Sequence, residues 1–397
     1  MLQKKLNSYI SRFSDGPVQN SEAWQVERRK YIGGSEMGTI LGKETHSNVM
    51  GLIIKKLPYE ITKFTDNFPK FACKWGHLFE PVIKEIINNK LKTKIVGDNI
   101  WIRDPSVHPH ITNSPDGFGI VKLKTMKSGE IQITSAVGSK QKITLFEFKC
   151  PISRIPKDNS IPAWYLPQVH NGLNISSEIT DTAIFVDAKF VKCSIEDFKL
   201  DAFHFDQKFH NYMSEKKSVD AKGYFLINKM SSKLVDYITT NHPETLYTDP
   251  ITNKTVIDFG KCNYFCFVET LIDNALDTKC IIISKTSSKI DFKEFESDII
   301  GIFPWKLVKL VLVPVEADNT KYKELMYPKI DDIFHDIELI KSNPILLDKY
   351  KQDVNEYLYE KSNPITEFKT VLMNKKTYSD ESDEIIRNFL HKRIFKD

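Results

Sequence analysis

The stretch "TLFEFKCP", residues 144–151, decides the fold, because it combines the pattern of a core strand with two charged residues. Side chains alternate between the two faces of a strand, so Leu145, Glu147 and Lys149 are expected to point to the same face. An acid and a base would then share one space within an otherwise apolar segment. A salt bridge on a solvated face explains most pairs of this kind, so the tripeptide alone does not establish a site.

Two other acidic residues are expected near this strand. Asp116 stands in the turn sequence "SPDG", which carries its carboxylate to the edge of the sheet that holds Glu147. Glu80 lies at the start of a helix and borders an apolar stripe that begins at Phe79. Buried carboxylates that converge require a cation or a shared proton, because each unpaired one costs several kcal/mol. The pattern therefore predicts a site for a hard, oxygen-binding ion such as Mg²⁺.

Length and composition indicate an ordinary globular protein. The chain has 397 residues, of which 41% are hydrophobic and 27% charged, and these values argue against disorder. The net charge of +4 permits a polyanionic partner without requiring one. The N-terminal residues lack a secretory signal, the apolar runs are too short to span a membrane, and the six cysteines are too sparse for a disulfide framework. We therefore expect a soluble, intracellular protein with reduced thiols and no membrane partner.

The order of periodic segments predicts a mixed sheet flanked by helices. Two short helical pieces are expected within residues 22–42, with Ser35 as the N-cap of the second, and a longer helix follows "KWGH", with Pro81 in its first turn. Strands are expected over 99–104, 118–123, 130–134 and 143–149, then a helix over 163–176 and a strand over 182–190. Further strands are expected over 223–228, 264–272, 280–284 and 306–317, followed by a helix over 322–342 and a helical tail.

Five segments resemble the lambda-type exonuclease and YqaJ-type viral recombinase family of restriction-endonuclease-like nucleases. They are "AWQVERRKYIGGSEMGTILG", "KWGHLFEP", "SPDGF", "LFEFKCPISR" and "YLPQVHNGL", in family order and at compatible intervals. The resemblance covers about residues 23–190, with a return strand and helix at about 307–342. It implies an α/β (α+β) fold with a restriction-endonuclease-like core, in which a central mixed β-sheet flanked by helices carries an inserted segment.

The resemblance also implies a catalytic role for individual residues. The metal ligands would be the carboxylates of Asp116, Glu147 and Glu80 and the backbone carbonyl of Phe148, while Lys149 would position or activate water. One or two Mg²⁺ ions, for which Mn²⁺ would substitute, would polarise the phosphate and lower the pKa of the attacking water. Lysine as the sole general base would require a strongly lowered pKa, which a sequence does not reveal.

A second group of residues is implied to orient the site and to bind the DNA end. Gln168 matches the family glutamine that orients the site, and Tyr165 matches its aromatic neighbour. Arg28 and Ser35 match residues that bind the 5′-terminal phosphate, and Arg154 lies one residue from the position of another phosphate-binding arginine. Without the resemblance, Arg28 and Ser35 would be interpreted as a solvated basic turn and an ordinary helix cap.

His108 and His110 precede the turn that carries Asp116. Some members of the wider nuclease class use an upstream histidine as a metal ligand, but lambda-type enzymes do not need one. We therefore expect both histidines to be loop residues.

The expected organisation divides the chain into four parts. They are the first part of a nuclease core at 1–190, an insertion at 191–305, the return strand and helix of the core at 306–342, and a helical C-terminal tail at 343–397. The insertion carries no motif that indicates a role. This organisation requires the strand over 307–315 to join the sheet that carries Glu147.

These expectations favour a metal-dependent exonuclease that digests double-stranded DNA from 5′ ends. It would serve recombination or end processing for a virus, in the host cytoplasm or nucleus, with a single-strand-annealing recombination protein as a partner. Two alternatives stay open: an endonuclease of the same fold, and an inactive nuclease fold that binds DNA ends. The sequence does not decide between a monomer and a ring-like homo-oligomer.

Overall fold

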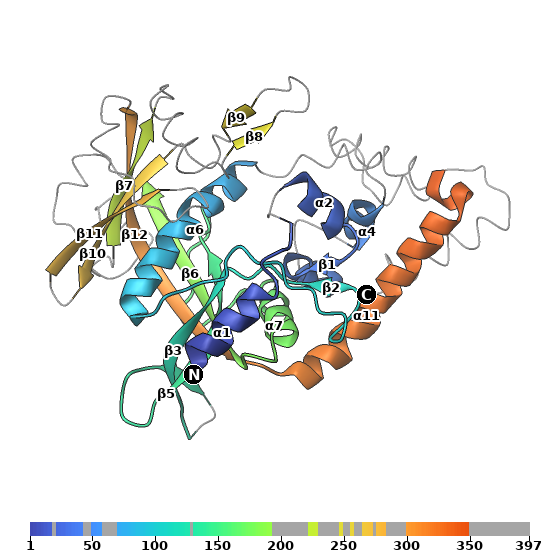
Figure 1. Ribbon diagram of the computed structural model, residues 1–397, viewed down its shortest axis with the longest axis horizontal. Coiled ribbons are helices and arrows are strands. Elements are labelled where there is room, and N and C mark those ends of the chain that lie inside the picture. Colours follow the sequence, from blue (N-terminus) through green and yellow to red (C-terminus); the bar gives the residue numbers. More distant parts are fainter. Residues whose placement is uncertain are drawn as a thin grey trace.

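The protein is built around one mixed sheet of eight strands (Figure 1). The computed structural model describes residues 1–17, 21–42, 49–57, 70–127, 130–192, 221–228, 246–248, 255–257, 264–272, 275–282 and 299–348. The strand order of the sheet is β11-β10-β7-β12-β6-β5-β3-β4. β5 and β6 are parallel, and the other neighbouring strands are antiparallel. The predicted fold class, a mixed α+β sheet flanked by helices, is confirmed.

Four strands of the sheet come from the N-terminal half of the chain. They are β3 (Gly117–Thr125), β4 (Ile131–Ile133), β5 (Lys140–Lys149) and β6 (Thr182–Lys192). The strand predicted over 99–104 is wrong, because that segment forms only an isolated bridge between Ile102 and Asn113. A turn begins at Asp104, and Pro105 has no N–H with which to extend the pairing. The neighbouring β2 (Ile111–Thr112) pairs instead with β1 (Ile32–Gly33).

The long strand β12 (Ile299–Glu316) joins the two halves of the sheet. It pairs with β6 along residues 305–316 and with β7 (Ala221–Asn228) along residues 299–307. The strand over 307–315 therefore lies in the sheet that carries Glu147, as the expected organisation requires. β10 (Tyr264–Ile272) and β11 (Ala275–Ile282) continue the same sheet beyond β7, while β8 (Leu246–Thr248) and β9 (Thr255–Ile257) form a separate pair. The division of the chain into domains stays a prediction.

Helices cover both faces of the sheet. On one face, α6 (Lys70–Leu91) packs Phe79 against Phe190 and Trp305 of the sheet. On the other, the buried side chains of Leu145 and Phe185 pack against several helices. These are α1 (Leu2–Ser11), α3 (Met37–Ile40), α4 (Val49–Lys56), α7 (Leu166–Ile175) and α11 (Asn319–Ser342). Alternation along β5 thus sends Leu145 to the face of α7 and Phe146 to the face of α6.

Two predicted details of the helices are wrong. α6 begins at Lys70, so Pro81 lies in its interior and not in its first turn. The buried face of α6 compensates for the hydrogen bond that Pro81 does not make. Ser35 caps no helix, because it lies within the 3₁₀ turn η1 (Gly34–Glu36). The N-cap of the preceding helix α2 (Glu22–Arg28) is Ser21, whose hydroxyl accepts from the backbone N–H of Trp24.

α11 is fastened to the rest of the fold by polar contacts at its N-terminal half. The Tyr322 hydroxyl donates to Asn171 of α7 at 2.9 Å, and the Tyr327 hydroxyl donates to the backbone carbonyl of Val107 at 3.1 Å. The tail predicted over 343–397 lies, beyond Asp348, outside the described residues. No helix in the described part of the chain combines the length and apolar character needed to cross a membrane.

Candidate active site

Glu147 and Lys149 lie at the C-terminal end of β5, where the strand reaches the parallel neighbour β6. The Lys149 ammonium lies 2.5 Å from a carboxylate oxygen of Glu147. Only 3% of the Glu147 side chain is exposed, against 21% of the Lys149 side chain, so the ion pair is mostly withdrawn from water. Glu147 and Lys149 therefore form a mostly buried ion pair and not a salt bridge on a solvated face.

Asp116 meets the same strand from the turn that precedes β3. Its carboxylate accepts the backbone N–H of Phe148 at 2.5 Å. Gly117, which pairs with Phe146, has a φ of +142° and a close contact: a side chain there would meet Ile95 at 2.4 Å. Glycine is needed at this position because L residues rarely adopt that backbone conformation. The turn thus places the Asp116 carboxylate beside the residue that separates Glu147 from Lys149.

Gln168 approaches Glu147 from α7. Its side-chain amide donates to the same Glu147 oxygen that faces Lys149, at 2.5 Å. The helix lies close to β5 at Gly172, where an added side chain would meet Leu145 at 2.6 Å. Gly172 therefore allows α7 to approach the strand closely enough for Gln168 to reach the carboxylate.

Tyr165, the N-cap residue of α7, lies between two cations. The Lys149 ammonium lies 5.0 Å from the centre of the Tyr165 ring, and the Arg154 guanidinium lies 5.5 Å from it. Both distances are within the range of cation–π attraction. Tyr165 thus contacts the candidate site through its ring.

Burial and neighbouring negative charges raise the pKa of both Asp116 and Glu147. Burial is the largest cause of the raised pKa of Asp116, and the negative charges of Glu147 and Glu80 add to it. Burial likewise raises the pKa of Glu147, although Lys149 acts in the opposite direction. Burial alone would lower the pKa of Lys149, but Glu147 and Asp116 raise it above its ordinary value. The charges of the site are therefore unbalanced, with more acid than base.

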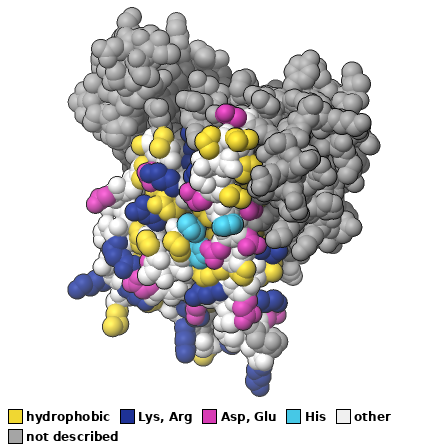
Figure 2. All heavy atoms as spheres, turned by 90° about the vertical axis from the view of Figure 1, so that its right-hand side faces the viewer, with side chains coloured by type: hydrophobic (Ala, Val, Ile, Leu, Met, Phe, Trp, Pro, Cys, Tyr) yellow, Lys and Arg dark blue, Asp and Glu magenta, His cyan; other side chains and the backbone are white. Residues whose placement is uncertain are grey.

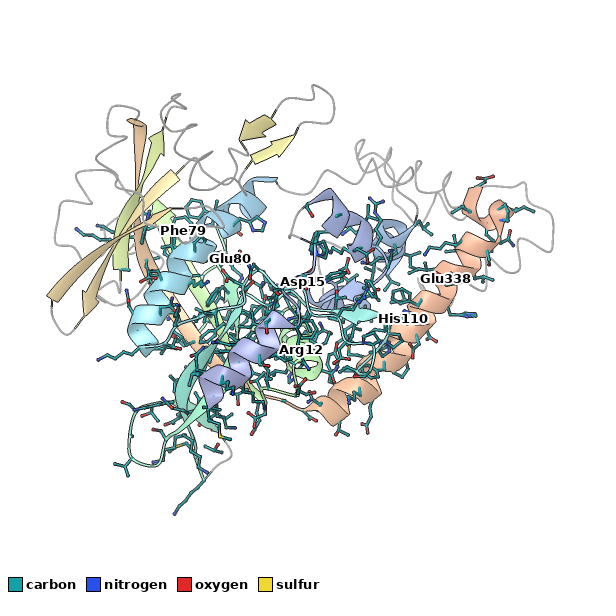
Figure 3. The ribbon with its side chains drawn as sticks, viewed as in Figure 1. Arg12, Asp15, Phe79, Glu80, His110 and Glu338 are labelled. Carbon is teal, nitrogen blue, oxygen red and sulfur yellow. The ribbon has the colours of Figure 1, made fainter. Side chains whose placement is uncertain are left out.

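Glu80 contributes charge to this site from a distance. It lies on α6 next to Phe79, with 40% of its side chain exposed, and its carboxylate is 3.7 Å from His77 (Figure 3). Within the described residues, no three His, Cys, Asp or Glu side chains are gathered in a way that would surround a metal ion. The donors nevertheless suit a hard cation, since they are carboxylate and carbonyl oxygens and the buried acids repel one another. Metal binding by Asp116, Glu147, Phe148 and Glu80 stays a prediction.

Arg28 and Ser35 lie together in the N-terminal part of the chain, and these two residues are called the basic pocket below. The Arg28 guanidinium donates to the Ser35 hydroxyl at 3.0 Å and packs over the ring of Trp24 at 4.9 Å. Ser35 is exposed, and 33% of the Arg28 side chain is exposed. The structure thus brings the two predicted phosphate-binding residues together, which their sequence spacing alone did not require.

Arg154 is held by a residue that the sequence analysis missed. Its guanidinium forms a two-pronged ion pair with Asp187 of β6, one contact of which measures 3.0 Å. Burial raises the pKa of Asp187, and Arg154 opposes this shift. The signal was present in "TAIFVDAKF", where an acid interrupts an apolar strand in the same way that Glu147 does. A phosphate contact by Arg154 stays a prediction, and its guanidinium is already engaged by Asp187.

Glu36 and Lys56 form a second buried ion pair that was also missed. The Lys56 ammonium contacts both carboxylate oxygens of Glu36, at 2.7 and 3.0 Å. The Glu36 carboxylate also accepts the backbone N–H of Gly33 at 2.9 Å. No sequence signal indicated that Lys56, at the end of α4, is buried.

His108 and His110 bind α11. His108 is buried, with its ring nitrogen 3.2 Å from a carboxylate oxygen of Asp331. The His110 ring stacks on Phe334 at 4.0 Å, beside α11 (Figure 3). Histidine and acidic side chains are adjacent on this face of the molecule (Figure 2). Their role in the described structure is to dock the helix.

The mixed sheet with its flanking helices is consistent with a nuclease-like α/β fold. Residues 23–179 match the family model of the YqaJ-like viral recombinase domain. Similar proteins come from three isolates of African swine fever virus. Those of the Malawi and Pretoriuskop isolates are 28% identical over 353 residues, and that of the Badajoz strain is 27% identical. Each alignment covers 87% of this chain and 94% of the relative. The family indicates a nuclease or recombinase role with DNA as substrate.

Proposed function

We propose that this protein is a Mg²⁺-dependent exonuclease that digests double-stranded DNA from its 5′ ends. The observation that carries the proposal is the set of contacts at the end of β5. There the buried carboxylate of Glu147 lies beside Lys149 and Gln168, and the partly buried carboxylate of Asp116 accepts the backbone N–H of Phe148. Oxygen donors with excess negative charge favour binding of a hard divalent cation.

The ligands that would hold the ion are the carboxylates of Asp116 and Glu147 and the carbonyl of Phe148, with Glu80 nearby on α6. When bound, Mg²⁺ supplies a Lewis acid that polarises the phosphate and acidifies water. Mn²⁺ has the same preference for oxygen ligands and is expected to substitute.

The protein's own residues would orient the reactants. Gln168 donates a hydrogen bond that holds the Glu147 carboxylate in place, and the Lys149 ammonium forms an ion pair with the same carboxylate. That charge would stabilise the negative charge that builds up on the phosphate during hydrolysis. The ring of Tyr165 limits the positions that the Lys149 ammonium adopts.

The preference for 5′ ends would come from Arg28 and Ser35. A guanidinium binds a terminal phosphate through two hydrogen bonds, and the exposed hydroxyl of Ser35 offers a third. Digestion of one strand would leave a single-stranded 3′ tail. Such a tail is the substrate that a single-strand-annealing recombination protein would take up in a virus with a DNA genome.

A degradation assay tests this proposal. The purified chain is incubated with a linear duplex that carries 5′-phosphate ends, in buffers with Mg²⁺, Mn²⁺, Ca²⁺ or a chelator. We expect mononucleotides to be released with Mg²⁺ and Mn²⁺ only. Asp116→Asn should abolish the release, whereas the matched control Asp181→Asn, at an exposed ion pair with Lys142, should not. Undiminished activity of Asp116→Asn would overturn the proposed chemistry.

A covalently closed circular duplex separates the exonuclease from an endonuclease of the same fold. An exonuclease leaves the circle intact, whereas an endonuclease linearises it. Binding of DNA ends without turnover in every metal buffer would indicate an inactive nuclease fold.

A further inference from the structure

Arg28 belongs to a group of three charged side chains from three separate elements. Lys56, the last residue of α4, contacts both oxygens of Glu36 and also donates to the backbone carbonyl of Arg28 at 3.2 Å. The Arg28 guanidinium lies 3.9 Å from the same Glu36 carboxylate. Charged contacts therefore join α2, η1 and α4 directly behind the basic pocket.

The three side chains differ in their access to solvent. Only 2% of the Lys56 side chain and 9% of the Glu36 side chain are exposed, against 33% for Arg28. One face of the Arg28 guanidinium is covered by the Trp24 ring. Arg28 is therefore the member of this group that a ligand can reach.

With all three side chains in their ordinary charged forms, the group carries one excess positive charge; burial lowers the pKa of Lys56, and its contacts with both oxygens of Glu36 oppose that shift. Burial alone would raise the pKa of Glu36, but Lys56 and Arg28 hold it below its ordinary value, so Glu36 is ionised at neutral pH. An ionised carboxylate this close to Arg28 would compete with an anionic ligand for the guanidinium. Lys56, in contact with both oxygens, offsets that competition.

We propose that Lys56 is the counter-charge that neutralises Glu36 and thereby leaves the Arg28 guanidinium available for a 5′-terminal phosphate. This inference rests on the proposed function and adds a positioning pair, Glu36 and Lys56, that does not touch the phosphate. The preference for phosphorylated ends then depends on the balance between the two charges and not on either residue alone.

A purely structural role for the pair makes a different prediction. In that case the pair only ties α4 to the 3₁₀ turn, and any loss of the pair harms the pocket. In our proposal, Lys56→Met leaves Glu36 facing Arg28 and weakens phosphate binding. Glu36→Gln combined with Lys56→Met removes both charges at similar volume and restores it.

The test uses the full chain and two duplexes that differ only in having 5′-phosphate or 5′-hydroxyl ends. One readout is the ratio of kcat/KM for the two ends with Mg²⁺, and the other is the ratio of Kd by fluorescence anisotropy in a chelating buffer. We expect the wild type to prefer the phosphorylated end. Lys56→Met should lower both ratios about tenfold, through KM and not kcat, as for loss of a hydrogen bond to a charged group.

The double variant Glu36→Gln/Lys56→Met distinguishes charge balance from a purely structural role of the pair. We expect its two ratios to return to within about twofold of the wild-type values, because the second substitution removes the carboxylate that Lys56→Met leaves facing Arg28, which is the coupling expected of two residues in contact. If they stay as low as in Lys56→Met, the inference is overturned. Should Lys56→Met fail to fold, the double variant alone still decides, because a wild-type ratio supports the charge balance and a lost ratio contradicts it.

The two readouts also separate this inference from the proposed function. A wild type that binds and degrades both ends equally contradicts the inference and leaves a nuclease without end preference. A wild type that prefers phosphate in binding but degrades neither duplex contradicts the nuclease, and the Kd ratios of the variants still test the charge balance.

Discussion

The candidate active site and the basic pocket are built in the same way with opposite signs. Each contains a buried ion pair, Glu147 with Lys149 in the first and Glu36 with Lys56 in the second. Each adds a third charged group, which is the carboxylate of Asp116 in the first and the guanidinium of Arg28 in the second, both of them partly buried. One site therefore has an excess acid and the other an excess base.

The difference shows in the pKa values of the carboxylates. Burial and neighbouring acids raise the pKa of Asp116, whereas Lys56 and Arg28 overcome burial and lower the pKa of Glu36. In the first site, the carboxylates of Asp116 and Glu147 repel each other, and a bound cation would reduce that repulsion. In the second site, Lys56 neutralises the Glu36 carboxylate, so the Arg28 guanidinium is left to bind an anion. In the proposed function, the complementary ligands are a divalent metal ion for the first site and a terminal phosphate for the second.

The strongest test of this contrast is Asp116→Asn. The rate of duplex degradation should fall by about 1,000-fold, because a charge-stabilising interaction worth ~4 kcal/mol in the transition state is lost. In metal-free buffer the same variant should melt no lower than the wild type, since it removes a buried acid beside two others. Single-turnover kinetics and thermal unfolding measure the two effects, and a large loss of stability would contradict the picture of stored repulsion.

The corresponding change in the basic pocket should act mainly on stability. Lys56→Met should lower the free energy of unfolding by ~3 kcal/mol, because it leaves the buried Glu36 carboxylate unpaired. The measurement is urea unfolding at neutral pH. Lys341→Met, at an exposed helical ion pair with Glu338, is the matched control and should change stability by less than about 0.5 kcal/mol.

The pH dependence of stability should follow from the lowered pKa of Glu36. Its pKa in the folded protein lies below the ordinary value of 4.5. Its contribution to stability is therefore fully present above about that pH and is lost as the pH falls through the folded pKa. The difference in unfolding free energy between wild type and Glu36→Gln should be constant near neutrality and should shrink in acid. A difference that grows on acidification would show that the shift has the opposite sign.

The smallest effect is expected at Ser35. Ser35→Ala removes one exposed hydroxyl from the basic pocket, so the affinity for a duplex with 5′-phosphate ends should fall about threefold, as for one ordinary hydrogen bond. Affinity for the 5′-hydroxyl duplex should not change. Equal weakening for both duplexes would place Ser35 outside the phosphate contact.

Periodicity and turn chemistry predicted the frame of the site. The alternation in "TLFEFKCP" correctly sent Leu145 and Glu147 to the face that α7 covers, and "SPDG" correctly marked the turn at Asp116. These features are local, since they depend on strand geometry and on the residues that a turn requires. The structure adds the contacts of Gln168 and Tyr165 to the site, whereas their catalytic roles stay predictions.

Features that depend on contacts between distant parts of the chain could not be predicted from the sequence. Pro81 was expected at a helix start because an interior proline costs a hydrogen bond, but burial of the α6 face offsets that cost. Ser35 follows two glycines and was expected to cap a helix, yet the backbone forms a 3₁₀ turn there. The burial of Lys56 could not be foreseen, because its partner Glu36 lies 20 residues earlier in a different element.

The pairing of β12 with β6 sets the order in which this chain can fold during synthesis. β6 ends at Lys192, and its antiparallel neighbour begins only at Ile299. Until the ribosome has released that later segment, the backbone N–H and C=O groups on one side of β6 have no strand to pair with, so β6 is an open edge. Pairing over so long a separation in sequence is slow, and open apolar edges promote aggregation. β6, the parallel neighbour of the strand that carries Glu147, therefore gains its second neighbour only late in translation, and a chain stopped before residue 299 would leave that edge open and be prone to aggregate.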